Sequence, residues 1–456
     1  MVRSVDAQGF LNELMQTLTE RGRALLRRAR SGGPDNTDLV ELAEMLLSRR
    51  GEASGVVLAQ TLLSSYAGAP VEVRLQFLKA LAERFGTDPE AVAAAVEAYR
   101  ASPDVTTIGA LHAAIEPRRQ ELFRRLNLAA GGTFALVRMR EELLDHLKAN
   151  PELRAVDTDF GHLFSSWFNR GFLQMRPIGW TTPASILEKI IRYEAVHPIA
   201  GWNDLKSRLD PSDRRCFGFF HPQLDDEPLI FVEVALTNDI PGAVAPLLAL
   251  DRAPIAASTA TTAIFYSISN TQRGLAGVSF GHFLIKQVVV DLKRDLPNLK
   301  TFVTLSPAPG FAAWLRRERA AEGSAFLTAE TKAALRRLDE PAWFEDAATR
   351  AELEEALMPI AAHYFLHAKN ENGRPVDPVA RFHLGNGARL ERMNFLGDLS
   401  ERGLRQAHGL MVNYLYDLSA IEKNHEAYAE AGDIAASASV RRIAKDLVTR
   451  DLVPSH

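Results

Sequence analysis

Apolar side chains recur at steps of three and four residues through the first third of the chain, which is the spacing of an amphipathic helix. Glycine or proline punctuates these segments, as expected at helix ends. Because no motif of 34 or 40 residues repeats, we expect a helical bundle rather than a solenoid. The predicted helices cover residues 38–51, 55–68, 70–86 and 89–100, and the pattern continues through 104–128 and 133–153.

The pattern changes around residues 157–180, where aromatic residues, glycine and proline become frequent. We place a domain junction near residue 160. Beyond it, β-branched and aromatic runs predict strands, and amphipathic segments between them predict helices. The expected fold class is α+β, with an all-helical domain over 1–160 and a mixed α/β domain over 161–456. The predicted strands are 229–236, 261–268 and 301–305, and the predicted helices include 280–296 and 311–321.

Composition narrows the classes of function. The chain has 456 residues with 53 Lys and Arg against 57 Asp and Glu, a net charge of -4, so no basic field favours a nucleic-acid partner. A single cysteine, Cys216, rules out an intramolecular disulfide and suits a reducing compartment. No apolar run approaches the roughly 20 residues of a membrane span. Residues 1–22 carry three acidic side chains, unlike a presequence, and the chain does not end in a peroxisomal signal, so we expect a cytoplasmic protein.

The stretch GLAGVSFGHFLI, residues 274–285, contains the pattern Gly-x-Ser-x-Gly around Ser279. In α/β-hydrolases such a serine is the nucleophile on a sharp turn directly between a strand and a helix. Here the predicted strand ends near residue 268, and residues 269–276 intervene before the motif. Only the helix that follows fits the hydrolase context, so we do not favour a nucleophilic role for Ser279.

The glycines of this stretch favour a role for the main chain instead. Gly274, Gly277 and Gly281 permit close approach of a ligand, and amides at the start of a helix bind phosphate. Arg273 and Lys286 would add positive charge. On these residues alone, glycines that merely let a helix pack on a sheet are an equal alternative.

Histidine pairs with the spacing of metal ligands do not complete a metal motif. His363 and His367 lie four residues apart, but Tyr364 occupies the position of the glutamate in His-Glu-x-x-His. Residues 425–429, HEAYA, have the glutamate but lack the second histidine. We therefore expect no metal.

Several longer segments resemble the malonyl-CoA decarboxylase family, and together they cover most of the chain. The stretches Ser-Pro-x-Pro-Gly-Phe and Phe-His-Leu-x-Asn-Gly are long and chemically unusual. Two departures are that the chain does not end in Ser-Lys-Leu and that it lacks the several cysteines of relatives controlled by disulfides between subunits. The segments are residues 126–140, 221–240, 265–289, 304–315, 378–398 and 409–418.

The resemblance implies a helical oligomerisation domain followed by a catalytic domain shaped like the GNAT acetyltransferases. It implies cofactor-independent decarboxylation of malonyl-CoA to acetyl-CoA and CO2 by a homo-oligomer, either a dimer or a tetramer. No cofactor is expected, because the thioester itself accepts the electrons. By the same resemblance, the loop after the fourth strand binds coenzyme A, with Arg273, Gly274, Ala276, Gly277, Val278, Ser279, Phe280, Gly281 and His282 as candidates.

The resemblance also names the catalytic candidates. His383 would donate the proton, since imidazole titrates near neutral pH, and Ser306 would orient the imidazole or the malonyl carboxylate. On the sequence alone, the simpler interpretation of His383 is a packed or surface histidine, and that of Ser306 is a turn residue or the N-cap of the helix at 311–321. Asn413 and Tyr416 would hydrogen-bond the carboxylate or the thioester oxygen; the alternative is a buried helix with satisfied polar groups.

Two other functions stay open at this point. An N-acyltransferase of the GNAT type would use the same coenzyme A loop to pass an acyl group to an amine. A non-catalytic sensor would bind malonyl-CoA and leave it intact.

Overall fold

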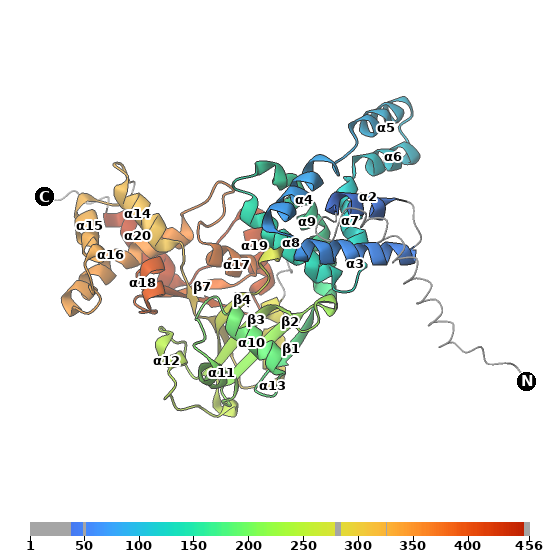
Figure 1. Cartoon of the computed structure of the whole chain (residues 1–456). Coiled ribbons are helices and arrows are strands. Elements are labelled where there is room, and N and C mark those ends of the chain that lie inside the picture. Colours follow the sequence, from blue (N-terminus) through green and yellow to red (C-terminus); the bar gives the residue numbers. More distant parts are fainter. Residues whose placement is uncertain (1–37, 49–51, 279–283, 325, 451–456) are drawn as a thin grey trace, which may run out of the picture. The chain divides into compact units, whose positions relative to one another are not determined.

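A computed structural model describes residues 38–48, 52–278, 284–324 and 326–450, and the chain forms two compact units (Figure 1). The helical unit contains the described residues up to Leu173, with residues 221–225 and 272–278. The sheet unit contains the remaining described residues. This arrangement confirms the α+β class, with helices first and a mixed sheet afterwards. Helix α9, Arg154–Trp167, runs through the junction expected at residue 160.

The helical unit is built from the predicted amphipathic helices. Their apolar faces form a core in which, for example, the rings of Phe123 and Phe160 stack with centroids 4.1 Å apart. The expected helices between residues 38 and 153 are confirmed, with ends that differ by a few residues. The helices are α2 (Leu39–Leu47), α3 (Glu52–Gly68), α4 (Val71–Glu83), α5 (Pro89–Ala101), α6 (Val105–Ile115), α7 (Arg118–Asn127), α8 (Gly132–His146) and α9.

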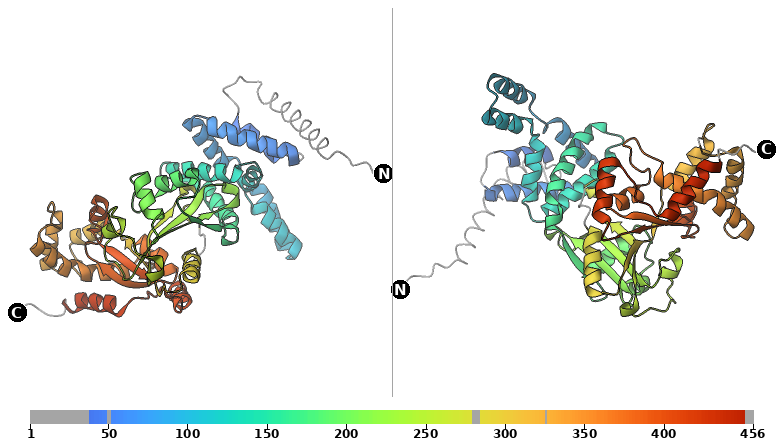
Figure 2. Two further views of the ribbon diagram at one scale, coloured as in Figure 1. Left: turned by 90° about the horizontal axis from the view of Figure 1, so that it is seen from below. Right: turned by 180° about the vertical axis from the view of Figure 1, so that it is seen from behind.

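The sheet unit contains one sheet in the order β1-β2-β3-β4-β5-β8-β6, and β7 pairs with β8. Among the described strands, only β4 and β5 are parallel, and the crossover helix that such a pair requires is α13, Leu284–Asp295 (yellow in Figure 2). The predicted strands at 229–236, 261–268 and 301–305 are confirmed as β3, β4 and β5. The strands are β1 (Gln174–Ile178), β2 (Arg214–Phe220), β3 (Pro228–Thr237), β4 (Thr262–Asn270), β5 (Thr301–Thr304), β6 (Ser306–Pro307), β7 (Arg389–Asn394) and β8 (Met411–Leu415).

A β-bulge in β4 opens the sheet. Glu233 of β3 lies opposite Ser267 and Val234 lies opposite Phe265, so Tyr266 is an extra residue without a partner on β3. On the other side, β4 pairs with β5 only as far as Phe265, and the Leu305 N–H donates to the Phe265 carbonyl at 3.0 Å. After the bulge β4 continues to Asn270 without β5 beside it. Bulges of this kind recur beside functional sites.

Residues 409–418 do not form the buried helix that was considered as an alternative. The core of this segment forms β8, which pairs with β7 on one side and with β5 and β6 on the other. Main-chain partners on both sides favour the extended strand. The remaining helices of the sheet unit are α10 (Ala184–Tyr193), α11 (Trp202–Leu209), α12 (Ala245–Leu248), α14 (Phe311–Ala320), α15 (Ala329–Ala334), α16 (Ala347–Leu366), α17 (Pro378–Gly385), α18 (Glu401–Ala407), α19 (Ile421–Ala431) and α20 (Ala438–Arg450).

Among the helices of the described residues, none is long and apolar enough to cross a membrane.

Candidate active site

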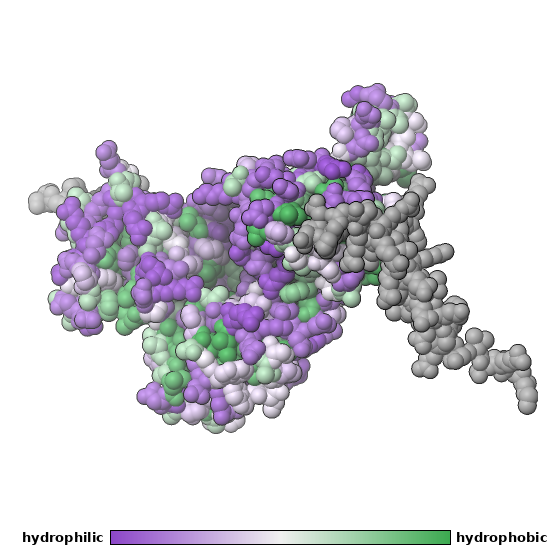
Figure 3. All heavy atoms as spheres, in the orientation of Figure 1, coloured by the Kyte–Doolittle hydropathy of each residue, from purple (hydrophilic) through white to green (hydrophobic). Residues whose placement is uncertain are grey.

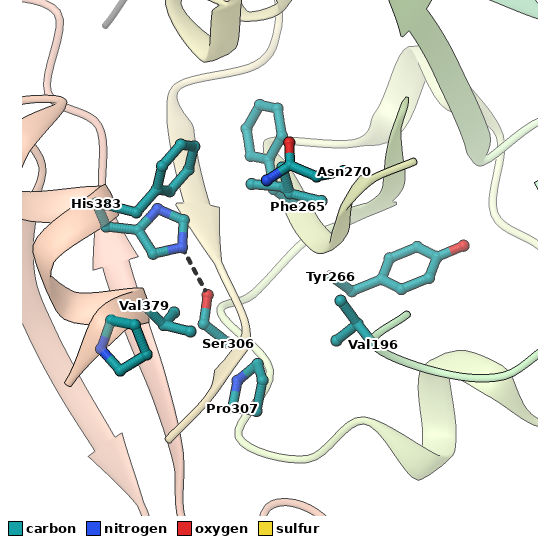
Figure 4. Close-up of a pocket in the computed structure, with 11 residues that line it drawn as sticks. Val196, Phe265, Tyr266, Asn270, Ser306, Pro307, Val379 and His383 are labelled. Atoms are coloured by element: carbon teal, nitrogen blue, oxygen red, sulfur yellow. Dashed lines mark hydrogen bonds between the residues drawn. The ribbon is translucent and has the colours of Figure 1, made fainter. Parts of the chain in front are cut away.

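A pocket of about 230 Å³ lies where β4 and β5 part, entirely within the sheet unit (Figure 4). Its walls come from β4, β6, α17 and the loop between α10 and α11. Most of the lining side chains are apolar, and none of the described residues that line the pocket is a lysine or an arginine. The lining residues are Val196, Phe265, Tyr266, Ile268, Asn270, Ser306, Pro307, Pro378, Val379, Phe382 and His383.

Helix α17 carries His383 into this pocket, and both ends of the helix are fixed. Asp377 caps its start by accepting hydrogen bonds from the Val379 and Ala380 N–H groups at 2.9 and 2.8 Å. Pro378 occupies the first helical position, where its missing N–H costs nothing. Gly387 ends the segment with φ +79°, and an added Cβ there would lie 2.1 Å from the Ile421 carbonyl oxygen. The histidine is thus held on a short, rigid helix.

Three side chains form a continuous hydrogen-bonded chain through His383. Nε2 of His383 lies 3.1 Å from Ser306 Oγ, and Nδ1 lies 2.7 Å from the hydroxyl of Tyr416 (Figure 4 shows the serine contact). Ser306 Oγ in turn donates to Thr304 Oγ1 at 2.9 Å. Ser306 lies in β6 rather than at a helix start, since Gly310 is the residue that precedes α14. The structure therefore brings together three of the four catalytic candidates.

The ionisation of His383 differs from the expectation. The side chain is buried, and this burial lowers the pKa of His383 to about 3. In the free protein the pKa thus departs from the expected titration near neutral pH, because no charged partner among the described residues offsets the loss of hydration. Burial also raises the pKa of the Tyr416 phenol well above its ordinary value, so this hydroxyl keeps its proton.

Asn413 is the fourth candidate, and the structure does not bring it to the pocket. Its Nδ2 donates to the carbonyls of Thr304 at 2.8 Å and Pro241 at 3.3 Å. Its Oδ1 accepts from Asn394 at 2.8 Å and from Arg392 at 3.1 Å. Every hydrogen-bonding position of the side-chain amide is occupied by protein groups. Asn413 therefore links β8 to its neighbours through hydrogen bonds.

The glycine-rich loop is described only as far as Val278. Gly274 lies against α8, where an added Cβ would lie 2.0 Å from the Val137 carbonyl oxygen, so this glycine serves packing. Arg273 forms an ion pair with Asp145. Gly277 has φ +77° and open space around an added Cβ. Ala276 follows the short 3-10 turn of residues 273–275, whereas Ser279, Phe280, Gly281 and His282 lie outside the described residues.

The histidines weighed as metal ligands make other contacts. The His363 ring stacks on Phe326 with centroids 4.3 Å apart, and the His367 ring lies 5.3 Å from the His363 ring. Nδ1 of His425 contacts the Gly385 carbonyl at 2.6 Å. Within the described residues, no three His, Cys, Asp or Glu side chains come together as a metal site.

The sequence reasoning missed two residues beside the catalytic candidates. Thr304 accepts the hydrogen bond of Ser306, and a signal was present, because residues two apart in an extended chain point to the same side. Val196 lines the pocket from a loop nearly 190 positions before His383, and nothing in its own segment signals this placement.

Comparisons with known proteins identify the family of the chain. A family model described as the malonyl-CoA decarboxylase C-terminal domain matches residues 171–452, and one for the N-terminal domain matches residues 85–168. The mitochondrial malonyl-CoA decarboxylase of Anser anser anser is 36% identical over 403 residues, covering 80% of this chain and 79% of the relative. That of Mus musculus is 35% identical over 416 residues and covers 83% of each.

Crystal structures of two bacterial malonyl-CoA decarboxylases are similar along most of the chain. That from Rhodopseudomonas palustris has 64% identity and a TM-score of 0.87, covering 89% of this chain and 98% of the other. That from Agrobacterium vitis has 59% identity and a TM-score of 0.86, covering 90% and 100%. These matches confirm the resemblance, and the chain belongs to the malonyl-CoA decarboxylase family.

Proposed function

We propose that this protein decarboxylates malonyl-CoA to acetyl-CoA and CO2. The observation that carries the proposal is the Ser306–His383–Tyr416 chain beside a mostly apolar pocket, whose lining includes no lysine or arginine from the described part of the chain. In the reaction the bond between the α-carbon and the carboxyl carbon breaks. The electron pair passes into the thioester as an enolate, CO2 leaves, and the α-carbon takes up one proton. The thioester is the electron sink, so no metal or organic cofactor is required.

The apolar pocket favours loss of the carboxylate. A carboxylate moved from water into such surroundings loses hydration, and its conversion to neutral CO2 removes that penalty. An enolate oxygen needs preorganised donors. Asn270 lines the pocket, and its side-chain amide can donate. The Asn270 amide makes no hydrogen bond within the described residues, so it is available to a ligand.

The required proton comes from His383 in two stages. Free His383 is neutral because burial lowers its pKa to about 3. A malonyl carboxylate beside it raises that pKa, because its negative charge stabilises the protonated imidazole. His383 then takes up a proton with the substrate and delivers it to the α-carbon after CO2 has left. Ser306 holds the ring while this happens.

We further propose that the loop of residues 273–282 binds the phosphates of coenzyme A through its main chain. Its support is the positive φ of Gly277 and the open space around it, which let a ligand approach the backbone. Gly274 takes part only by fixing the start of the loop on α8.

Homo-oligomerisation through the helical unit is also a proposal. Helix α6 has no buried residue, and Val105, Ile108 and Ile115 are 88%, 53% and 49% exposed. Figure 3 shows pale green, apolar surface over the α5–α6 pair. We expect Val105→Lys combined with Ile108→Lys to reduce the mass measured by light scattering. A cytoplasmic location is proposed from the single cysteine.

One assay tests the reaction against its alternatives. Purified protein is given malonyl-CoA without any amine, and CO2 and acetyl-CoA are followed. Formation of both products supports decarboxylation, whereas a GNAT-type N-acyltransferase would need an amine and a sensor would return intact malonyl-CoA. His383→Asn should keep the melting temperature within a few degrees and lower kcat by about 100-fold or more. Unchanged turnover in this variant would reject the role of His383.

A further inference from the structure

A second pocket adjoins the first one within the sheet unit. It has a volume of about 160 Å³ and is lined in part by His197, Arg402 and Leu410. Val196, Pro307 and Val379 line both pockets, so their side chains lie between the two spaces. We infer that Val196 limits the size of the acyl group, and that this protein discriminates against malonyl thioesters with an alkyl group on the α-carbon. This inference rests on the proposed function.

Of the three residues that line both pockets, Val196 is the one that does not lie on an element carrying Ser306 or His383. Pro307 directly follows Ser306 in β6, and Val379 lies in the first turn of α17, which holds His383. Val196 lies in the loop between α10 and α11. Its side chain therefore sets the width of the pocket independently of the positions of Ser306 and His383.

The loop that presents Val196 is held by a buried carboxylate. Glu194 accepts hydrogen bonds from the N–H groups of Val196 at 2.9 Å and His197 at 2.8 Å. The same carboxylate accepts from Ser267 Oγ at 2.8 Å and Ser269 Oγ at 3.1 Å, both on β4. The loop is thus tied directly to β4, which also forms part of the pocket wall.

Two arginines hold the carbonyl groups of the same loop. Arg208 donates to the carbonyls of His197 at 2.8 Å and Pro198 at 3.2 Å, and Arg402 donates to that of Ala195. With its N–H groups and its carbonyls both bonded, the loop cannot shift easily to admit a larger ligand. Val196 is a fixed wall, and a smaller side chain there would join the second pocket to the first.

The relevant substrates are α-alkylmalonyl thioesters, for which ethylmalonyl-CoA is a suitable probe. Their β-carboxylate allows the same bond cleavage, so only the fit of the alkyl group changes. One methylene in an apolar pocket alters kcat/KM by about 10-fold or more. For Val196→Ala we expect the ratio of kcat/KM for ethylmalonyl-CoA to that for malonyl-CoA to rise about 10-fold over the unmodified protein.

Val290→Ala is the matched control, because Val290 is an exposed residue of α13 and should leave the ratio unchanged. Val196→Leu enlarges the side chain without a polar group and should lower the ratio. This second variant keeps the test decisive if Val196→Ala unfolds. An unchanged ratio in a folded Val196 variant overturns the inference, and CO2 release from malonyl-CoA by the unmodified protein shows that the proposed function itself holds.

Discussion

The hydroxyl of Tyr416 lies 2.7 Å from Nδ1 of His383, on the side of the ring away from Ser306. The hydrogen bond from Ser306 to Thr304 determines which tautomer of the imidazole fits between Ser306 and Tyr416. Ser306 donates its one hydroxyl proton to Thr304, so it accepts from Nε2 of His383, and Nδ1 then accepts from Tyr416. The free protein thus holds a proton on Nε2, the nitrogen next to the pocket residue Ser306.

Removing the phenol hydroxyl should weaken this arrangement. For Tyr416→Phe we expect kcat to fall about 10- to 100-fold with little change in KM, because Nδ1 loses the donor that fixes the ring. Tyr414→Phe is the matched control: its ring stacks on His383 with centroids 4.6 Å apart, but its buried hydroxyl has no hydrogen-bond partner within the described residues. Equal turnover in the two variants would argue against a role for the Tyr416 hydroxyl.

The two serines considered as reactive groups should behave differently. Ser306→Ala removes the hydroxyl that contacts Nε2 of His383, and we expect a loss of about 100-fold in kcat measured as CO2 release. Ser279→Ala should keep most of the activity if the loop binds coenzyme A through main-chain groups. Abolished activity in Ser279→Ala, with Ser306→Ala active, would instead support a hydrolase-type nucleophile.

Stability should depend on pH through His383. An exposed imidazole titrates near 6.5, whereas burial lowers the pKa of His383 to about 3. Below about pH 6.5 the unfolded chain takes up a proton that the folded chain does not. The free energy of unfolding therefore decreases as the pH is lowered. Through His383, the free energy of unfolding is about 2 kcal/mol lower at pH 5 than at pH 7.5.

Urea unfolding at the two pH values measures this contribution. His383→Gln should lose less stability between pH 7.5 and pH 5 than the unmodified protein, by about that amount. The other buried histidines are common to both proteins and cancel. His162→Gln, at an exposed position of α9, should show the same pH dependence as the unmodified protein. Parallel curves for His383→Gln would contradict the predicted burial of a neutral ring.

The end of α17 should tolerate only glycine at position 387. Gly387→Ala combines φ +79° with a Cβ 2.1 Å from the Ile421 carbonyl, and we expect it to lower the free energy of unfolding by about 3 kcal/mol or more. Gly432→Ala has a similar φ of +70° but its nearest neighbour is 3.9 Å away, so about 1–2 kcal/mol is expected. Equal losses in denaturant unfolding would show that the contact with Ile421 relaxes without cost.

Much of the secondary structure was predictable because local patterns dominate it. The helices of the first third and strands β3, β4 and β5 follow from periodicity, and Ser306 and His383 became candidates through the resemblance of their segments to a known family. Segment 409–418 was ambiguous because a buried strand with partners on both sides is apolar throughout, like a buried helix.

The parts that could not be predicted depend on contacts between distant segments. The neutral state of His383 is a consequence of burial, which one motif does not reveal. The packing of Gly274 on Val137 and the occupied amide of Asn413 depend on neighbours more than 100 positions away. The position of Val196 in the pocket wall likewise depends on contacts between distant segments.

The extra residue in β4 also determines which side chains face which way. Phe265 and Tyr266 both line the pocket, and after them Ile268 and Asn270 continue that face while Ser267 and Ser269 turn to Glu194. Deleting one residue here would exchange the two sets, placing hydroxyls in the substrate chamber and an isoleucine against a carboxylate. Insertions and deletions in this strand are therefore far more harmful than most substitutions, and variation among functional sequences should preserve its length.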